Sequence, residues 1–271
     1  MKKQNLLITI LLISNLTISG QSLKPLREQI KDKYTLKYGI PIRIVETITD
    51  YNNKSTKTKE ENIDFSQTGD TITRSRYKNR KLEMANICIY NQDKYKISEK
   101  SKRLITNAGW ASIETSYYYK GKNLSEVNTT YNNVSSKETK ISTKAIIECD
   151  SSGNLTDSKL YNSDNILILH ETGKYDYKNN KWIYSAYDSI GGLRQQETLE
   201  IIPSKKNNEN GDVILYAKDS REKNDIFYRV DYLYDEFGNW IEKRIYKLRK
   251  KGNNIQNEKL FQKINRKIEY K

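Results

Sequence analysis

One short phrase recurs in this chain and constrains its fold more than any other feature. It reads Asp-x-x-Gly, then a small polar or Gly residue, then an apolar one. Asp in the first position can accept a hydrogen bond from the backbone two residues on, and Gly in the fourth can adopt the left-handed conformation of a bulge. Each copy therefore predicts a tight β-hairpin turn. The copies are centred on Asp150 and Gly153, Asp188 and Gly191, and Asp235 and Gly238.

Residues 1–20 have the pattern of a secretory signal peptide. Lys2 and Lys3 form a positive start, a mostly apolar run follows, and small residues come after it. This run is too short to span a membrane, and no other segment approaches about 18 apolar residues. We expect the mature chain, 21–271, to be exported to the periplasm or to the extracellular or outer-membrane surface of a bacterium. A retained N-terminal anchor is the alternative.

The composition of the mature chain fits a folded, basic β-protein. Loss of Lys2 and Lys3 lowers the formal charge from +14 to +12, and only 35% of the residues are hydrophobic. The 21 Tyr and 3 Trp nevertheless supply wide amphipathic surface, and Tyr favours strands in which its hydroxyl stays wet. This composition argues against disorder.

The hydrophobic pattern predicts one short helix followed by strands. Within 23–38, Leu26, Ile30 and Tyr34 fall on one helical face, whereas from residue 40 onward the pattern has period two. We expect a mainly β fold: a single domain over 21–271, built as an antiparallel meander of irregular hairpins in a twisted or rolled sheet, with about twelve strands. The polar segment 51–62 reads as a loop or a solvated hairpin tip. A half-barrel wrapped around the helix is the alternative architecture.

The hairpin centred on Asp235 predicts its own register. A type I turn with a Gly bulge would place Tyr234 opposite Trp240 and Leu233 opposite Ile241. These are favourable aromatic and aliphatic cross-strand pairs, and a slip of one residue would lose them.

The phrase Tyr234-Asp-x-x-Gly238-Asn239 with a following large apolar residue resembles the YD repeat of the RHS family, in particular short secreted bacterial proteins with a few degenerate copies. In large RHS proteins such repeats build a β-sheet shell around a cargo, and this chain is too short to enclose one. Gly192 replaces the Asn in the second copy, and Cys149 replaces the Tyr in the first. The resemblance implies β-hairpins within about 146–271 and indicates no activity.

Few residues in this chain could carry out catalysis. The only histidine, His170, ends an apolar strand-like run, and no nucleophile elbow, phosphate loop or calcium loop occurs. We expect no catalytic residue, no cofactor and no metal site. Cys88 and Cys149 can bridge in an oxidising compartment or stay as two buried thiols, and the sequence does not decide between them.

Aromatic and basic residues are the best candidates for binding. Exposed rings can stack on sugars or peptides, and the alternative is that they form the core. Between 243 and 271, eleven Lys or Arg face only two acidic residues, so this region can attract an anionic glycan, or it is simply a solvated hairpin. Nucleic acid is the poorest partner for an exported protein. The candidate ligand contacts are Trp110, Tyr117, Tyr119 and Trp182, and the candidate anion contacts are Arg249, Lys250 and Lys251.

Three hypotheses about function follow. The first is a non-catalytic exported module that binds an envelope glycan or a surface protein. The second is a structural or assembly element whose open sheet edge pairs with a partner strand. The third is a cryptic carbohydrate-active enzyme, which requires two carboxylates that converge. The oligomeric state is not indicated.

Overall fold

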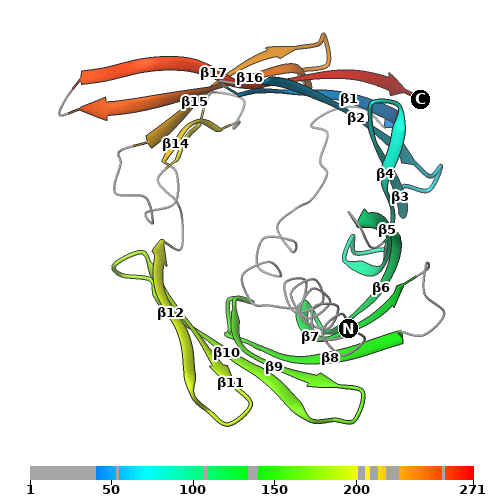
Figure 1. The fold of residues 1–271 in the computed structure, drawn as a ribbon, viewed down its shortest axis with the longest axis vertical. Helices are drawn as coiled ribbons and strands as arrows, with labels where there is room; N and C mark the ends of the chain where they lie inside the picture. The colour runs from blue at the N-terminus through cyan, green and yellow to red at the C-terminus, as the bar shows by residue number, and fades with distance from the viewer. Residues whose placement is uncertain are drawn as a thin grey trace, which may run out of the picture. The chain divides into compact units, whose positions relative to one another are not determined.

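The computed structural model describes residues 41–271 except 53–54, 106–108, 134–139, 201–204, 208–212, 218–225 and 252–253. The expected signal peptide and the helix expected over 23–38 lie outside these residues. The described residues form antiparallel strands joined by turns, so the mainly β meander is confirmed (Figure 1). They contain no helix long and apolar enough to cross a bilayer.

The strands divide into two compact units, where the sequence suggested one domain. The first unit comprises residues 88–199, and each strand from β5 to β11 pairs antiparallel with the next one in the chain. Its strands are β5 (Lys96–Ile105), β6 (Gly109–Lys120), β7 (Asn123–Asn133), β8 (Lys140–Cys149), β9 (Leu155–Asn162), β10 (Leu167–Asp176), β11 (Lys181–Asp188) and β12 (Leu193–Glu200).

The second unit comprises 41–87 and 200–271 and joins the two ends of the described chain. Its last strand lies between two others, because it pairs antiparallel with both β16 and β1. The basic region 243–271 therefore ends in a strand that is paired on both sides and is not an edge strand. The strands are β1 (Pro41–Asn52), β2 (Ser55–Phe65), β3 (Thr71–Lys78), β13 (Lys205–Asn207), β14 (Val213–Ala217), β15 (Ile226–Tyr234), β16 (Trp240–Lys251) and β17 (Asn254–Tyr270), while β4 (Lys81–Tyr90) contains the boundary.

Six turns in the described residues share one hydrogen-bond pattern. In each, the first residue accepts from the N–H three positions on and donates to the carbonyl four or five positions on, and the residue three positions on has positive φ. The Asp-x-x-Gly phrase makes three of these turns. In the others, Ser or Asn replaces Asp, and Lys94 or Asn165 can replace Gly. The first residues are Ser66, Asn91, Asp150, Asn162, Asp188 and Asp235.

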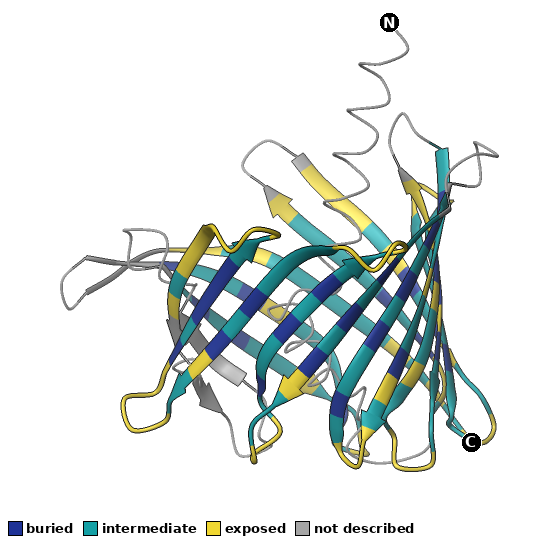
Figure 2. Ribbon diagram, turned by 90° about the horizontal axis from the view of Figure 1, so that it is seen from below, coloured by how far each residue is buried: buried dark blue, intermediate teal, exposed yellow. Residues whose placement is uncertain are grey.

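Burial alternates along the strands, as period two requires (Figure 2). In β7, Val127, Thr129 and Tyr131 are buried, while Glu126, Asn128 and Thr130, which alternate with them, are partly exposed. We call the side of the first unit that carries Val127 its buried face and the side that carries Glu126 its open face. The open face is polar, which explains why a strand such as β5 shows little hydrophobic signal in the sequence.

The expected solvated hairpin tip within 51–62 is confirmed, because β1 and β2 pair as far as Asn52 and Ser55 and the residues that follow Ser55 are exposed. Two other expectations need correction. The described residues form 17 strands rather than about twelve, because polar stretches also form strands. In the β15–β16 hairpin, which is centred on Asp235, Tyr234 does pair with Trp240. Leu233, however, pairs with Glu242, because a bulge leaves Ile241 without an opposite residue. The predicted register is therefore wrong by one residue beyond the first pair.

The two cysteines do not form the bridge that the sequence permitted. Neither thiol is part of a disulfide; Cys88 lies in a buried position and Cys149 in a half-buried one. The Cys149 thiol donates to the carbonyl oxygen of Leu124 at 3.5 Å. Burial is the largest influence on the pKa of this thiol and raises it, so Cys149 is a weakly nucleophilic thiol at neutral pH.

Candidate functional site

Two of the expected ligand contacts, Tyr117 and Tyr119, lie on the buried face of the first unit. Tyr117 is only 7% exposed, and its hydroxyl donates to Glu99 Oε2 at 3.2 Å, which Lys96 Nζ also approaches at 2.7 Å. Burial raises the pKa of Tyr117, and the nearby Glu99 carboxylate raises it further. This ring is therefore part of the sheet packing.

Tyr119 packs in the same region and is half-buried. Its hydroxyl donates to the carbonyl of Lys96 at 3.0 Å, and its ring lies 5.1 Å from that of Tyr95. Burial raises the pKa of Tyr119 to about 12. Trp110 is also half-buried, at the start of β6 and opposite Leu104.

Trp182 is the most completely covered of the four expected contacts, with 2% exposure. Its ring stacks on Tyr175 at 5.9 Å and tilts against Tyr184 at 5.7 Å. Gly173 makes room for it, because a Cβ there would lie 2.5 Å from the indole nitrogen. The Tyr184 hydroxyl donates to Glu171, a buried carboxylate. This aromatic cluster holds β10 and β11 together.

The open face of the first unit carries a continuous row of side chains. Because directly paired residues of neighbouring strands lie on the same face, the register places six residues side by side across β6 to β11. Five strand spacings of about 4.8 Å make this row about 24 Å long. Its members are Tyr118, Glu126, Ile146, Lys159, His170 and Tyr187, and we call it the Tyr118–Tyr187 row.

Aromatic rings stand at both ends of this row. Tyr118 is 50% exposed, so its ring is available where that of Tyr117 is not. At the other end, the rings of Tyr187 and His170 lie 5.8 Å apart with an interplanar angle of 34°. The row thus offers flat apolar surface at its ends and polar groups between them.

Ion pairs organise the middle of the row. Lys144 Nζ lies 3.0 Å from Glu126 Oε2, and Asn128 donates to Glu126 Oε1 at 2.8 Å. The hydrogen bond from Lys144 lowers the pKa of Glu126. His170 Nε2 lies 2.6 Å from Asp157 Oδ2. Glu126 and Asp157 are therefore each held by a cationic or ring N–H partner and keep a defined orientation.

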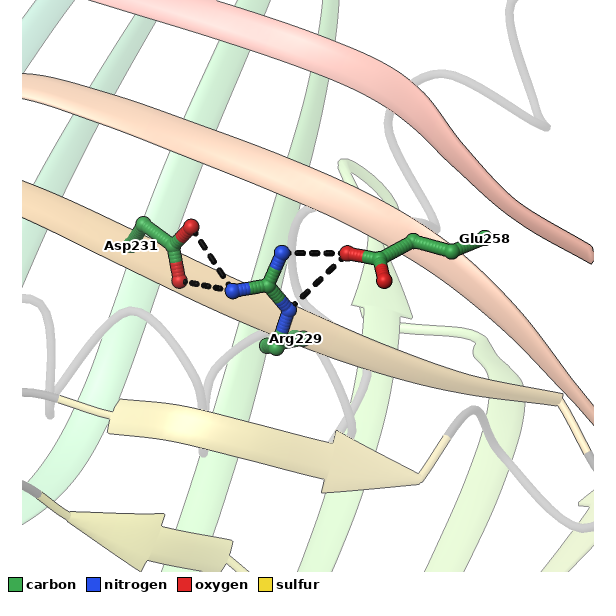
Figure 3. A network of polar contacts seen from close by, with 3 residues as sticks. All are labelled: Arg229, Asp231 and Glu258. Atoms are coloured by element: carbon green, nitrogen blue, oxygen red, sulfur yellow. Dashed lines mark hydrogen bonds and ion pairs between the residues drawn. The ribbon is translucent and has the colours of Figure 1, made fainter. Parts of the chain in front are cut away.

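The basic strands of the second unit are also ion-paired. Arg229 extends from β15 between Asp231, at 2.6 and 2.8 Å, and Glu258, whose Oε1 accepts from Nε at 3.0 Å (Figure 3). Glu242 binds both Arg244, at 2.6 Å, and Lys263, at 2.8 Å. In the described residues, these basic side chains are therefore compensated locally. The expected anion contacts Arg249, Lys250 and Lys251 lie in β16, but their side chains are outside the described ones.

Two carboxylates do converge in the second unit. Glu46 and Glu61 are directly paired across β1 and β2 and are only 7% and 6% exposed. Arg76 Nη2 binds Glu61 at 2.8 Å, and Arg266 Nε donates to Glu46 at 2.6 Å. Arg266 also lies flat on Trp240, with Cζ 3.3 Å from the ring centroid. We call this set the charge ladder. Since each glutamate faces an arginine, neither is placed as a proton donor.

The ligand contacts predicted on β6 lie on its buried face, because the type of residue alone does not distinguish one Tyr from the next. Nevertheless, a signal was present. Glu114, Ser116 and Tyr118 alternate with Ile113, Thr115 and Tyr117, so the polar neighbours mark Tyr118 as lying on the open face. The pairing of His170 with Asp157 had no such signal, because it depends on the register of β9 and β10. No group of three or more residues suited to hold a metal occurs in the part of the chain that the structure describes.

Comparisons with known proteins give distant matches only. Neither a family model nor a curated protein sequence matches this chain. Among solved structures, a porin-like protein from Bacteroides uniformis aligns with a TM-score of 0.43 and 12% identity over 84% of this chain and 96% of that one. A porin-like protein from Bacteroides vulgatus aligns with a TM-score of 0.34 and 13% identity over 86% of this chain and 99% of that one.

Proposed function

We propose that the chain is an exported, non-catalytic β-sheet module that binds an envelope glycan along the Tyr118–Tyr187 row. The observation that supports this proposal most directly is the half-exposed Tyr118 ring in line with ordered polar groups on one sheet face. The charged pattern at the start of residues 1–20 supports export to the periplasm or the outer surface.

The chemistry of the row suits a sugar chain. An exposed aromatic ring can cover the apolar face of a sugar ring. Sugar hydroxyls both donate and accept hydrogen bonds, so they can be recognised by a carboxylate such as Glu126 and by an ammonium such as Lys144 or Lys159. The length of about 24 Å suits an extended oligosaccharide that crosses the strands.

The electrostatics favour binding over hydrolysis. A glycosidase needs one carboxylic acid whose pKa is raised so that it can donate a proton. The pKa of Glu126 shifts in the opposite direction, because Lys144 donates a hydrogen bond to it. The buried pair Glu46 and Glu61 faces two arginines. The enzyme hypothesis has no proton donor among these groups.

A surface protein is the second candidate, favoured by exposed apolar residues at one end of the first unit. The β9–β10 and β11–β12 turns lie at the same end, because neighbouring strands alternate in direction. Ile166, Ile190 and Leu193 are exposed there, and Ile190 is 91% exposed. Such side chains can contact an apolar protein surface.

The test is a binding screen of the mature chain, 21–271, against acidic and neutral envelope glycans and lipopolysaccharide, with DNA as a control, at low and high salt. Tyr118→Ala should weaken binding of the bound glycan about three- to tenfold, which is the usual contribution of one aromatic contact. Tyr51→Ala, another exposed Tyr in β1, is the matched control and should leave affinity unchanged.

Binding that survives high salt and depends on Tyr118 supports the proposal. Equal losses in both variants, or no glycan binding, would contradict it. Binding to every polyanion, DNA included, that disappears at high salt would reduce it to a general effect of the +12 charge.

A further inference from the structure

The same three-atom contact occurs in two distant turns of the chain. In the turn that begins at Asp150, the Tyr177 hydroxyl donates to Asp150 Oδ2 and accepts from Asn154 Nδ2 at 2.8 Å. The backbone N–H of Asn154 already donates to Asp150 Oδ1 at 2.9 Å. The turn thus uses one carboxylate oxygen for its own fold and leaves the other oxygen and the amide for a tyrosine.

The turn that begins at Asp235 repeats this contact with a different tyrosine. Tyr270 donates its hydroxyl proton to Asp235 Oδ2 at 2.5 Å and accepts from Asn239 Nδ2 at 2.8 Å. The backbone N–H of Asn239 donates to Asp235 Oδ1 at 2.8 Å. Tyr270 comes from the end of β17, 35 positions away, so the contact is not a product of local sequence.

The third copy of the phrase, which lacks the Asn, has a different partner for its carboxylate. The Asp188 turn has Gly192 where the other two have Asn, and it keeps the backbone bond from Gly192 to Asp188 Oδ1 at 2.7 Å. Its second oxygen binds Arg194 Nε at 3.0 Å instead of a tyrosine. The turn therefore forms without Asn, and in this copy Arg194 takes the place of the tyrosine.

We infer that Asp-x-x-Gly-Asn is a binding site for a tyrosine hydroxyl, and that the copy at Asp235 uses it to fasten the C-terminal strand. The fastened end has further contacts. The rings of Phe237 and Tyr270 lie 4.8 Å apart, and Lys271 Nζ donates to the carbonyl of Gln67 at 2.8 Å. The chain end is thus held by the β15–β16 turn on one side and by the β2–β3 turn on the other.

This contact fixes one end of the β1–β17 ladder in the second unit. β17 pairs with both β16 and β1. Its C-terminal end, once fastened, therefore keeps β1 and β17 in register. A loosened Tyr270 would release the β1–β17 ladder from this end. We call Tyr270, Asp235 and Asn239 the C-terminal clasp.

Hydrogen exchange of the mature chain, resolved along the sequence, tests the clasp. Tyr270→Phe keeps the ring and removes only the hydroxyl, and Asn239→Gly copies the natural Asp188 turn. Both should accelerate exchange roughly three- to tenfold at 262–270 and leave the first unit unchanged. Tyr177→Phe is the matched control and should act at 150–156 without effect on β17.

Unchanged exchange at 262–270 in both variants would overturn the inference. Uniform acceleration over the entire second unit would also overturn it, because the hydroxyl would then add to global stability instead of fastening one strand end. Binding at the Tyr118–Tyr187 row should stay the same in either variant, so this test is independent of the proposed function.

Discussion

Trp182 in the first unit and Trp240 in the second each follow a polar turn and contact tyrosines, yet they occupy opposite environments. Trp182 is packed between Tyr175 and Tyr184 over Gly173. Trp240 lies under the guanidinium of Arg266 and 6.2 Å from the ring of Tyr232. The same amphipathic ring thus packs against other aromatic rings in one place and against a charged side chain in the other.

The neighbouring strand explains this difference. Next to Trp182, β10 presents Gly173, whose missing side chain leaves the space that the indole fills. Next to Trp240, β17 presents Arg266, whose charge is compensated by Glu46. A large flat ring accepts either partner, because its face is both apolar and electron-rich. The residue type at one position therefore does not determine the environment that it will have.

Replacement of each Trp by Ala should give the largest difference in stability loss between the two regions. We expect Trp182→Ala to lower the free energy of unfolding by about 3–5 kcal/mol, because it leaves a cavity in a fully packed site. Trp240→Ala should cost less, since Trp240 is only half-buried. Urea unfolding followed by circular dichroism measures both, and equal losses would show that burial does not distinguish the two sites.

Loss of the cation should affect the second region alone. Arg266→Ala leaves the Glu46 carboxylate buried beside Glu61, and we expect a loss of about 3 kcal/mol. Arg266→Lys keeps the charge and should recover part of it. Exchange protection in the first unit should stay unchanged. A neutral effect of Arg266→Ala would mean that the charge ladder adds no stability.

A single methyl group should sharpen the comparison. In Gly173→Ala, the new Cβ would lie 2.5 Å from the Trp182 indole nitrogen and 2.9 Å from the carbonyl oxygen of Leu155. We expect a loss of about 1–3 kcal/mol, because the ring must move. Trp fluorescence should change in Gly173→Ala, and it should stay the same in Gly192→Ala, which is the control. Full stability in Gly173→Ala would contradict the packing role of Gly173.

The stability should change least with pH near neutrality and should fall toward both extremes. Lys144 lowers the pKa of Glu126 in the first unit, and Lys263 lowers that of Glu242 in the second. Their stabilisation is present above the ordinary value of 4.5 and is lost as pH falls through the lowered folded values. Both units should therefore weaken in acid.

Alkaline pH should act through the buried tyrosines. The pKa of Tyr119 is raised from 10.0 to about 12, so its contribution is complete below pH 10 and is lost as pH rises toward 12. Absorbance of the phenolate, recorded with unfolding, measures this. Ionisation of all tyrosines at pH 10 with no loss of structure would contradict it.

Much of the local structure could be predicted from the sequence. The turns at Asp150, Asp188 and Asp235 require only five consecutive residues, and the structure closes them with the expected bonds. The alternation of residue types along β6 that places Tyr118 on the open face is equally local. The likeness to the YD repeat stays a prediction, and the fold adds a reason for the Asn that follows the Gly.

The candidate site could be predicted only in part. The sequence indicated aromatic and basic residues, but it favoured Tyr117 and Trp182, which the sheet buries. Tyr has nearly the same preference for a core and for a wet surface, so its side chain alone does not reveal the face. The basic tail looked unbalanced, because its acidic partners Glu242 and Glu46 come from outside it, and they reach Lys263 and Arg266 only through strand pairing.

The sequence by itself determined where this chain reverses direction and that its strands have two unlike faces. These are effects of a few neighbouring residues: the carboxylate and the glycine of a turn, and the period of two along a strand. Only the tertiary structure decided which face is covered, which acid holds His170, and which tyrosine enters each Asp-x-x-Gly-Asn turn. Those contacts join residues up to 220 positions apart, as Arg266 and Glu46 are, and their energies depend on register that no local pattern contains.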